Sequence, residues 1–233
     1  NPKFVKNVET DGAGIHRPVY DFDRKLMYSG GRKDGCNGRA LLIHDMKDPR
    51  NPTLIGEGWV PGQNEAAGEE PTWDLDLVSK GGVDLHEAIP YGNYVTCAWR
   101  RGGFGMMDLT DPTKPEFMWR RNFYETHNWS PASHTFMVPK GSHFGFLLTE
   151  THTTNCAHPP AFATFFDMRN HMDPISISTF NPYPLDPITM RPQDSSWCEQ
   201  GARYGAHNTW QWMKADDLLC LTWFNAGLRI LDW

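Results

Sequence analysis

The chain has 233 residues and a formal net charge of −6, and 39% of the residues are hydrophobic and 13% aromatic. This apolar content is enough for a core, and the length fits one large domain or two small ones. No apolar run approaches the roughly 18 residues of a membrane span, and an acidic balance without basic runs argues against nucleic-acid binding. The ten Trp, 18 Pro and 21 Gly favour a β protein rich in turns.

The chain begins at Asn1 rather than at a methionine, and it stops at Trp233 directly after an apolar run. We therefore expect a processed product or part of something longer. No signal peptide is visible, so a soluble cytoplasmic location and an exported one with the signal removed both stay open.

A histidine opens a β-patterned stretch at four places along the chain, and a turn and a second apolar strand follow each one. The four stretches are GIHRPVYDFD with His16, DLHEAIPYGN with His86, ASHTFMVPKG with His134, and AHNTWQWMKA with His207. The second strands read KLMYSG, NYVTCAW, FGFLLTE and LLCLTWF. Each stretch predicts a β-hairpin at the start of a repeated unit.

Downstream of each hairpin, an apolar run ends in Asp before a further strand that opens at Pro. The run and the strand are joined by an Asp-Pro turn. The copies lie at residues 40–55, 105–118, 163–179 (a looser copy), and 227–233 continued by 1–8. The final Asp residues are Asp45, Asp108, Asp167 and Asp232, and the outer strands open at Pro52, Pro115, Pro174 and Pro2.

Four-strand units of about 40–50 residues are the signature of a β-propeller. The sequence predicts a single all-β domain of four blades, at residues 13–60, 84–123, 132–180, and 205–233 with 1–10. Long insertions at 61–85 and 181–206 enlarge the loops at one mouth. In this prediction the N-terminal strand pairs with the C-terminal blade, which closes the ring and removes an open sheet edge.

The stretches FNAGLRILDW, GGFGMMDLTDPTKP and RALLIHDMKDPRNP resemble the LVIVD-repeat propellers. In that family a Gly-Leu-Arg-like strand ends in Asp before an Asp-Pro turn. The resemblance covers most of the chain at the level of the repeat, and it implies a propeller fold. The degenerate third copy and the two insertions depart from the family pattern. Blade architecture says little about chemistry, so the resemblance leaves the function open.

The innermost strand of each propeller blade runs along the central channel, so the four opening histidines are predicted to meet at one mouth. Imidazole nitrogens bind Zn, Cu, Fe and Ni, and we expect one divalent transition metal, with Fe or Cu favoured and Zn or Mn as alternatives. The ligand pattern resembles the four-His iron centre of carotenoid cleavage oxygenases. The alternative is a repeated residue that bonds a neighbouring blade. Arg17 and Glu87, which follow two of the histidines, are predicted to turn toward blade packing. The candidate metal ligands are His16, His86, His134 and His207.

Loops at the same mouth carry further polar candidates. Glu150 and His152 alternate along a strand end and therefore share one face. We expect His152 to act as a fifth ligand or as an acid/base, and Glu150 to orient a ligand histidine from outside the metal shell. Glu125 and His127 repeat the same spacing and are similar candidates. The alternative in both cases is a polar surface loop.

Aromatic and basic residues in these loops suggest a substrate pocket. Trp73, Trp129 and Trp197 precede the histidine strands, and they could line an apolar pocket for a hydrophobic or aromatic substrate. Tryptophans that wedge between blades are the alternative. Arg101 is a candidate for binding an anionic group.

Five cysteines, at positions 36, 97, 156, 198 and 220, are scattered without a CxxC motif. They predict neither a disulfide framework nor a thiolate metal site. No Cys–His–Asn arrangement indicates a nucleophilic thiol.

These features favour a metal-dependent enzyme that acts on a small, aromatic or apolar molecule. Oxidative chemistry is favoured because four neutral ligands leave the charge of the metal uncompensated. A metal-dependent lyase or hydrolase is one alternative, and a non-catalytic propeller that serves as a protein-interaction scaffold is another. The apolar outer faces of the blades permit oligomers without predicting them.

Overall fold

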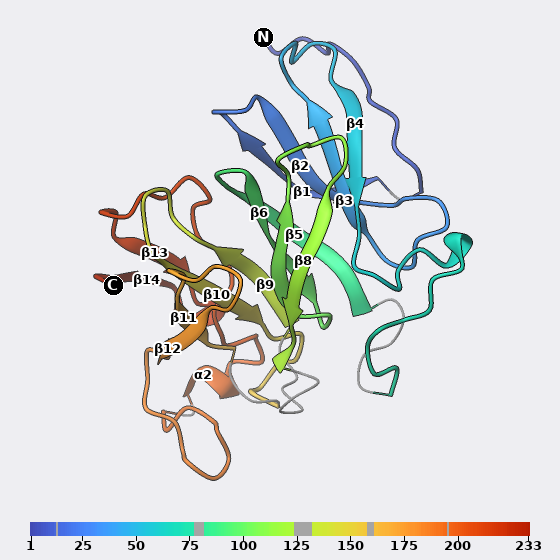
Figure 1. The fold of residues 1–233 in the computed structure, drawn as a ribbon. Coiled ribbons are helices and arrows are strands. Elements are labelled where there is room, and N and C mark those ends of the chain that lie inside the picture. The colour runs from blue at the N-terminus through green and yellow to red at the C-terminus, as the bar shows by residue number, and fades with distance from the viewer. Residues whose placement is uncertain (13, 77–81, 124–131, 158–160, 195) are drawn as a thin grey trace.

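The computed structural model describes all residues of the chain except 13, 77–81, 124–131, 158–160 and 195. The regular secondary structure of the described part is nearly all strand, in antiparallel sheets arranged as successive propeller blades (Figure 1). The first blade is a four-stranded sheet with the order β1-β2-β3-β4. Its strands are β1 (Ile15–Asp21), β2 (Leu26–Gly31), β3 (Ala40–Asp45) and β4 (Thr53–Gly58).

The second and third blades repeat this meander and are joined where β6 pairs with β9 at Arg100 and Ser133. The second blade consists of β5 (Val83–Tyr91), β6 (Tyr94–Arg100), β7 (Phe104–Asp108) and β8 (Glu116–Arg121). The third consists of β9 (Ala132–Met137), β10 (Phe144–Glu150), β11 (Ala163–Asp167) and β12 (Ile175–Phe180).

The fourth blade has two regular strands, β13 (Leu219–Thr222) and β14 (Leu228–Leu231). Its inner segment is held by an isolated bridge between Thr209 and Leu221 and by backbone bonds between His207, Asn208 and Thr222. The loops contain only short helical turns among the described residues. These are η1 (Glu65–Ala67), η3 (Phe224–Ala226) and α2 (Ser196–Glu199). No helix of the described chain has the length and hydropathy that a bilayer span requires.

The repeated Asp at the end of each third strand has a local structural role. The carboxylates of Asp45, Asp108 and Asp167 each accept a hydrogen bond from the backbone N–H two residues later, at 2.8, 2.7 and 3.0 Å. This Asx turn reverses the chain toward the outer strand. The outer strands β4, β8 and β12 each begin one residue after the predicted proline, because proline has no N–H to give to the ladder.

Apolar residues from adjacent blades form the core as three layers, one between each pair of neighbours. Tyr28 and Ile43 of the first blade pack with Trp99 of the second, and Phe104 of the second packs with Phe136 and Phe166 of the third. The third layer, between the third and fourth blades, contains Phe146, Leu148, Leu221 and Trp223. Burial between blades therefore fixes the inner strands relative to one another.

The predicted closure of the ring by the N-terminal segment is not formed. Residues 1–10 contain no strand, and the Lys6 ammonium donates to the Asn51 side chain at the first blade. The two ends of the chain lie apart in Figure 1. Phe4 and Val5 are exposed, so this segment has no buried face to fix a register. The third strand of the last blade, β14, keeps an open edge within the described residues.

Candidate metal centre

The four predicted histidines lie next to one another at one end of the inner strands, here called the His mouth. His16 is in β1, His86 in β5 and His134 in β9, and His207 precedes the bridge of the fourth blade. Ring centroids are 4.7 Å apart for His16 and His86, 3.8 Å for His86 and His134, and 4.3 Å for His134 and His207. Equivalent positions in successive blades thus place four imidazoles in one cluster.

A β-bulge accompanies the histidine in each of the three regular inner strands. The ladder is interrupted between His16 and Val19 in β1 and between Val83 and Glu87 in β5. In β9 the registered partners skip His134 altogether. Bulges re-aim side chains and recur next to functional sites. They explain why simple alternation along these strands is a poor guide to the direction of each side chain.

Hydrogen bonds fix which imidazole nitrogen is free in the two most buried histidines. His86 Nδ1 lies 2.8 Å from the His134 carbonyl, which only accepts, so Nδ1 carries the proton. Thr135 donates its hydroxyl proton to Glu87 Oε2 at 2.7 Å, so its oxygen accepts from His134 Nδ1 at 2.9 Å. Both bonds leave Nε2 with a lone pair, as a metal ligand requires.

Nε2 of His207 is also left with a lone pair if the side-chain amide of Asn208 is turned by 180°, which exchanges its nitrogen and oxygen. His207 Nδ1 lies 2.8 Å from the amide nitrogen of Asn208, while the buried amide oxygen has no hydrogen-bond partner among the described residues. Exchanging the two atoms gives that oxygen the Nδ1–H of His207 as a donor and frees Nε2. With the amide in this orientation, Nε2 of His207 has a lone pair, as in His86 and His134.

Glu150 faces the Nε2 side of the cluster. Its Oε1 is 3.6 Å from His207 Nε2, and its Oε2 is 4.0 Å from His134 Nε2. Ligands bound tetrahedrally at about 2.1 Å from zinc lie roughly 3.4 Å from one another. The trio His134, Glu150 and His207 therefore has nearly the spacing of a ligand set. The sequence predicts that Glu150 orients a ligand histidine from outside the metal shell, and the observed spacing would also suit a direct ligand.

A second trio, His86, Glu87 and His134, also has ligand atoms within 4.8 Å of one another. Here the carboxylate is already saturated, because Glu87 Oε1 accepts from Arg17 at 2.7 Å and from Gln211 at 2.8 Å while Oε2 accepts from Thr135. The Glu87 side chain is 0% exposed. This network supports the histidines from beneath, and it joins Arg17 and Glu87 across two blades.

Burial keeps the imidazoles neutral. It lowers the pKa of His86 to about 3, and it lowers the pKa of His134 further. Burial also lowers the pKa of His16, and the positive charges of Arg39, Arg100 and Arg17 add to the effect. For His207 burial again lowers the pKa, opposed by the nearby Glu150 carboxylate. Neutral imidazoles are the form that binds metal.

Sequence reasoning missed two residues at this mouth, Arg203 and Phe224. The Phe224 ring stacks on His207 with centroids 4.4 Å apart, and the Arg203 guanidinium lies 4.2 Å from the Phe224 centroid. Arg203 also pairs with Glu150 Oε1 at 2.5 Å. The sequence did contain a signal for Phe224. The segments WRRGGF and WFNAGL are equivalent parts of two repeats, and they place Arg100 and Phe224 at the same position, directly after a buried tryptophan.

Both residues at that position have a left-handed backbone, with φ of +50° for Arg100 and +38° for Phe224. This conformation is costly for bulky side chains, and it is concentrated at functional sites. Arg100 Nη2 lies 3.3 Å from His152 Nε2, and His152 in turn lies 3.7 Å from Glu150 Oε2. His152 is 35% exposed. Solvent therefore reaches His152, as it also reaches part of His16 and His207, and burial lowers the pKa of His152.

The remaining predicted residues lie elsewhere or outside the described chain. Trp73 is buried in the layer between the first two blades, and Trp197 packs beside Tyr183 against the layer of the last two blades. Arg101 is exposed, and its charge is felt at His152. The candidates outside the described residues are Glu125, His127 and Trp129.

One disulfide corrects the prediction from cysteine spacing. Cys156 and Cys198 are bonded, although 42 residues separate them in sequence. They come from the loop after Glu150 and from α2 in the long insertion before His207, so only the tertiary fold brings them together. Cys36, Cys97 and Cys220 are free.

No family model matches the chain, and no curated protein matches it. The predicted relation to LVIVD-repeat propellers therefore stays a prediction. Two solved structures are similar in fold. The periplasmic gluconolactonase of Pseudomonas aeruginosa has a TM-score of 0.49 and 8% identity, covering 93% of this chain and 55% of that chain. A protein from Lactobacillus plantarum has a TM-score of 0.42 and 12% identity, covering 97% and 72%. This chain thus spans about half the length of the gluconolactonase, and at these identities neither likeness bears on its chemistry.

Proposed function

We propose that this protein is a metal-dependent enzyme whose centre lies at the His mouth. In this proposal Nε2 of His86, His134 and His207 and a carboxylate oxygen of Glu150 hold one divalent transition metal. His16, whose ring touches His86, completes the set. The observation that carries the proposal is the combination of adjacent neutral imidazoles with one carboxylate on their Nε2 side.

The donor set favours Lewis-acid chemistry, as in hydrolysis or a lyase reaction. The sequence favours oxidative chemistry because four neutral ligands would leave the metal charge uncompensated. Glu150 adds a carboxylate, shared with Arg203, beside two of the imidazoles, and this weakens that reason. Imidazole and carboxylate together suit Zn, and Fe and Mn also accept this mixture. A bound metal would polarise a substrate oxygen or activate water.

The surrounding residues favour a small substrate with an anionic group. The guanidinium groups of Arg203 and Arg100 lie at the edge of the cluster, on either side of Glu150 and His152. Arginine presents paired donors that match a carboxylate or a phosphate. Burial lowers the pKa of His152, and its Nε2 accepts from Arg100. In this proposal the anionic group of the substrate draws Arg100 away, and Nε2 is then free to take a proton from the substrate or from water.

Metal analysis of protein purified without a histidine tag tests this proposal. We expect about one equivalent of metal in the wild type and almost none in His134→Ala. His143→Ala is the matched control, because His143 is exposed on a hairpin away from the cluster and should leave the metal content unchanged. A folded wild type that remains metal-free after incubation with Zn²⁺, Fe²⁺, Mn²⁺ and Cu²⁺ would contradict the proposal and favour the scaffold alternative.

A further inference from the structure

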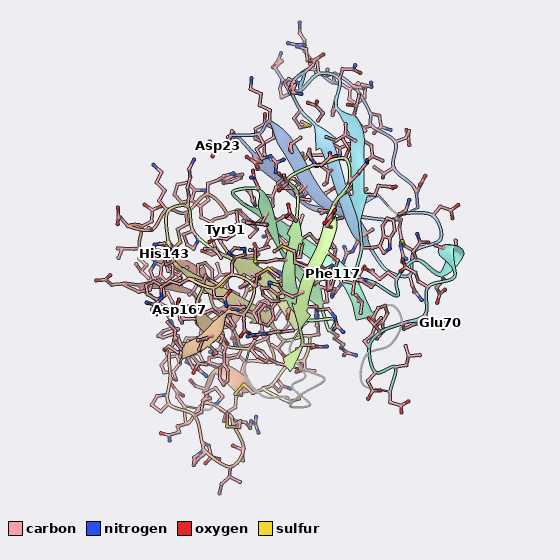
Figure 2. The ribbon with its side chains drawn as sticks, viewed as in Figure 1. Asp23, Glu70, Tyr91, Phe117, His143 and Asp167 are labelled. Carbon is pink, nitrogen blue, oxygen red and sulfur yellow. A yellow bond between two sulfur atoms is a disulfide. The ribbon has the colours of Figure 1, made fainter. Side chains whose placement is uncertain are left out.

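A cavity of about 610 Å³ lies at the opposite end of the inner strands. We call this end the hairpin mouth, because it is formed by the turns after β1, β5 and β9 and by the segment 211–214. Asp23, Tyr91 and His143, from three of these connections, lie on the same side of the ribbon in Figure 2. Five strand residues from His86 to Tyr91 place the outer end of the cavity roughly 17 Å from the histidines, while Gln211 at its inner end reaches the Glu87 carboxylate beneath them. Its volume lies in the range of small-ligand sites, about 300–1,000 Å³.

Exposed aromatic rings form one wall of the cavity. Phe22 is 65% exposed and Trp212 is 41% exposed, and their ring centroids are 5.7 Å apart. Trp212 donates its indole N–H to the Tyr20 carbonyl at 3.0 Å, and Phe22 packs edge-on against the Tyr20 ring at 4.6 Å. The wall is thus held in place without being covered. Rigid aromatic faces that remain open to solvent are suited to stacking against a planar ligand.

The charged groups of the cavity leave a positive excess. The buried Asp21 carboxylate already accepts from the Tyr28 hydroxyl and from two backbone N–H groups, and Asp23 pairs with Lys140 at 2.5 Å. Arg24 donates one guanidinium nitrogen to the Leu109 carbonyl, while its other terminal nitrogen is buried without a partner among the described residues. For Lys214 the described chain offers no ion pair.

We propose that this cavity is a second ligand site, which binds a small aromatic molecule carrying an anionic group. The aromatic wall at Phe22 and Trp212 stacks on the ring. The guanidinium nitrogen of Arg24 that has no hydrogen-bond partner and the ammonium group of Lys214 bind the anion, in a lining whose three cations exceed its two carboxylates by one. Gln211 closes the inner end of the cavity, with its amide bound to the buried Glu87. The site stands apart from the metal centre and does not require the metal.

Calorimetric titration with three probes tests the site. Indole-3-acetate has both the ring and the anion, tryptamine has the ring with a cation, and acetate has the anion alone. We expect saturable binding of indole-3-acetate at millimolar or lower concentration and much weaker binding of the other two. The titrations are made with chelator present and are repeated with His134→Ala, which should bind indole-3-acetate as the wild type does. Loss of binding in His134→Ala would move the anion site to the His mouth and overturn the proposal.

Two variants and a matched control locate the ligand. Trp212→Ala and Lys214→Glu should each weaken indole-3-acetate binding by about tenfold or more. Trp210→Ala is the control, since Trp210 is 59% exposed, lies two residues away and does not line the cavity. Lys214→Glu changes an exposed side chain, so it tests the site even if Trp212→Ala disturbs folding. No binding to the wild type, or binding that neither variant weakens, would overturn the proposal.

Discussion

The His mouth and the hairpin mouth differ, although both are formed by the inner strands β1, β5 and β9 and by the inner segment of the fourth blade. At the His mouth each regular strand carries a bulge, and three bulky residues (Arg17, Arg100 and Phe224) have a left-handed backbone. At the hairpin mouth the left-handed positions belong to Gly92, Gly141 and the exposed Lys25. Bulges and left-handed bulky residues are therefore more frequent at the His mouth than at the hairpin mouth. The repeated scaffold is the same throughout, and the departures from regularity distinguish the end where we propose the metal centre.

The largest contrast in stability is expected when one ion pair at each mouth is broken. Arg17→Ala leaves the buried Glu87 carboxylate without its cation, and we expect it to lower the free energy of unfolding by about 3–5 kcal/mol. Lys140→Ala breaks the pair with Asp23, in which both side chains are more than 70% exposed, and should cost less than about 1 kcal/mol. Urea denaturation measures both. Equal losses in the two variants would contradict the contrast between the mouths.

The disulfide is a second asymmetry, since it ties two loops of the His mouth. Replacing both Cys156 and Cys198 with Ser should lower the unfolding free energy by about 2–4 kcal/mol, because the unfolded chain regains the freedom of a long closed loop. Replacing the buried free Cys97 with Ala serves as a control with an intact disulfide. Thermal denaturation with and without reductant measures the effect. A wild type that reductant does not destabilise would argue against the bond.

Stability of the metal-free protein should fall in mildly acidic solution. Burial lowers the pKa of His86 to about 3 in the folded protein. Below about pH 6.5 this histidine is therefore protonated in the unfolded chain but stays neutral in the folded chain. Stability is then lost as pH falls from about 6.5 toward 3, by up to about 1.4 kcal/mol per pH unit for this histidine. Urea denaturation with chelator at several pH values measures the slope. His86→Gln should lower the slope by the share of this histidine, while the other histidines of the cluster keep theirs, and an unchanged slope in that variant would contradict the assignment.

A small effect is also expected at a turn of the hairpin mouth. Gly92 has φ of +62° in the connection between β5 and β6, and an added Cβ there would meet no atom within 4 Å. Gly92→Ala should therefore cost only the left-handed backbone, about 1–2 kcal/mol. Gly68→Ala is a matched comparison, because it has φ of +77°, equally open space, and a position in the loop before the second blade. Thermal denaturation compares the two variants, and a much larger loss at Gly92 would show that this turn does more than reverse the chain.

Much of the fold follows from the sequence alone. Alternating apolar residues and Pro, Gly and Asp turns determined the strands, because these depend on contacts within a few residues. The repeats determined that His16, His86, His134 and His207 are equivalent, since equal places in equal blades must come together around one axis.

Only the tertiary structure decided how the site is completed. Bulges turned Glu87 beneath the histidines, and the end of β10 brought Glu150 to their Nε2 side. Packing between loops of different blades brought Arg203 and Phe224 to His207 and paired Cys156 with Cys198. The same applies to the N-terminal segment, whose predicted pairing with β14 is absent. Each of these outcomes depends on contacts between residues far apart in the chain, and local pattern does not encode such contacts.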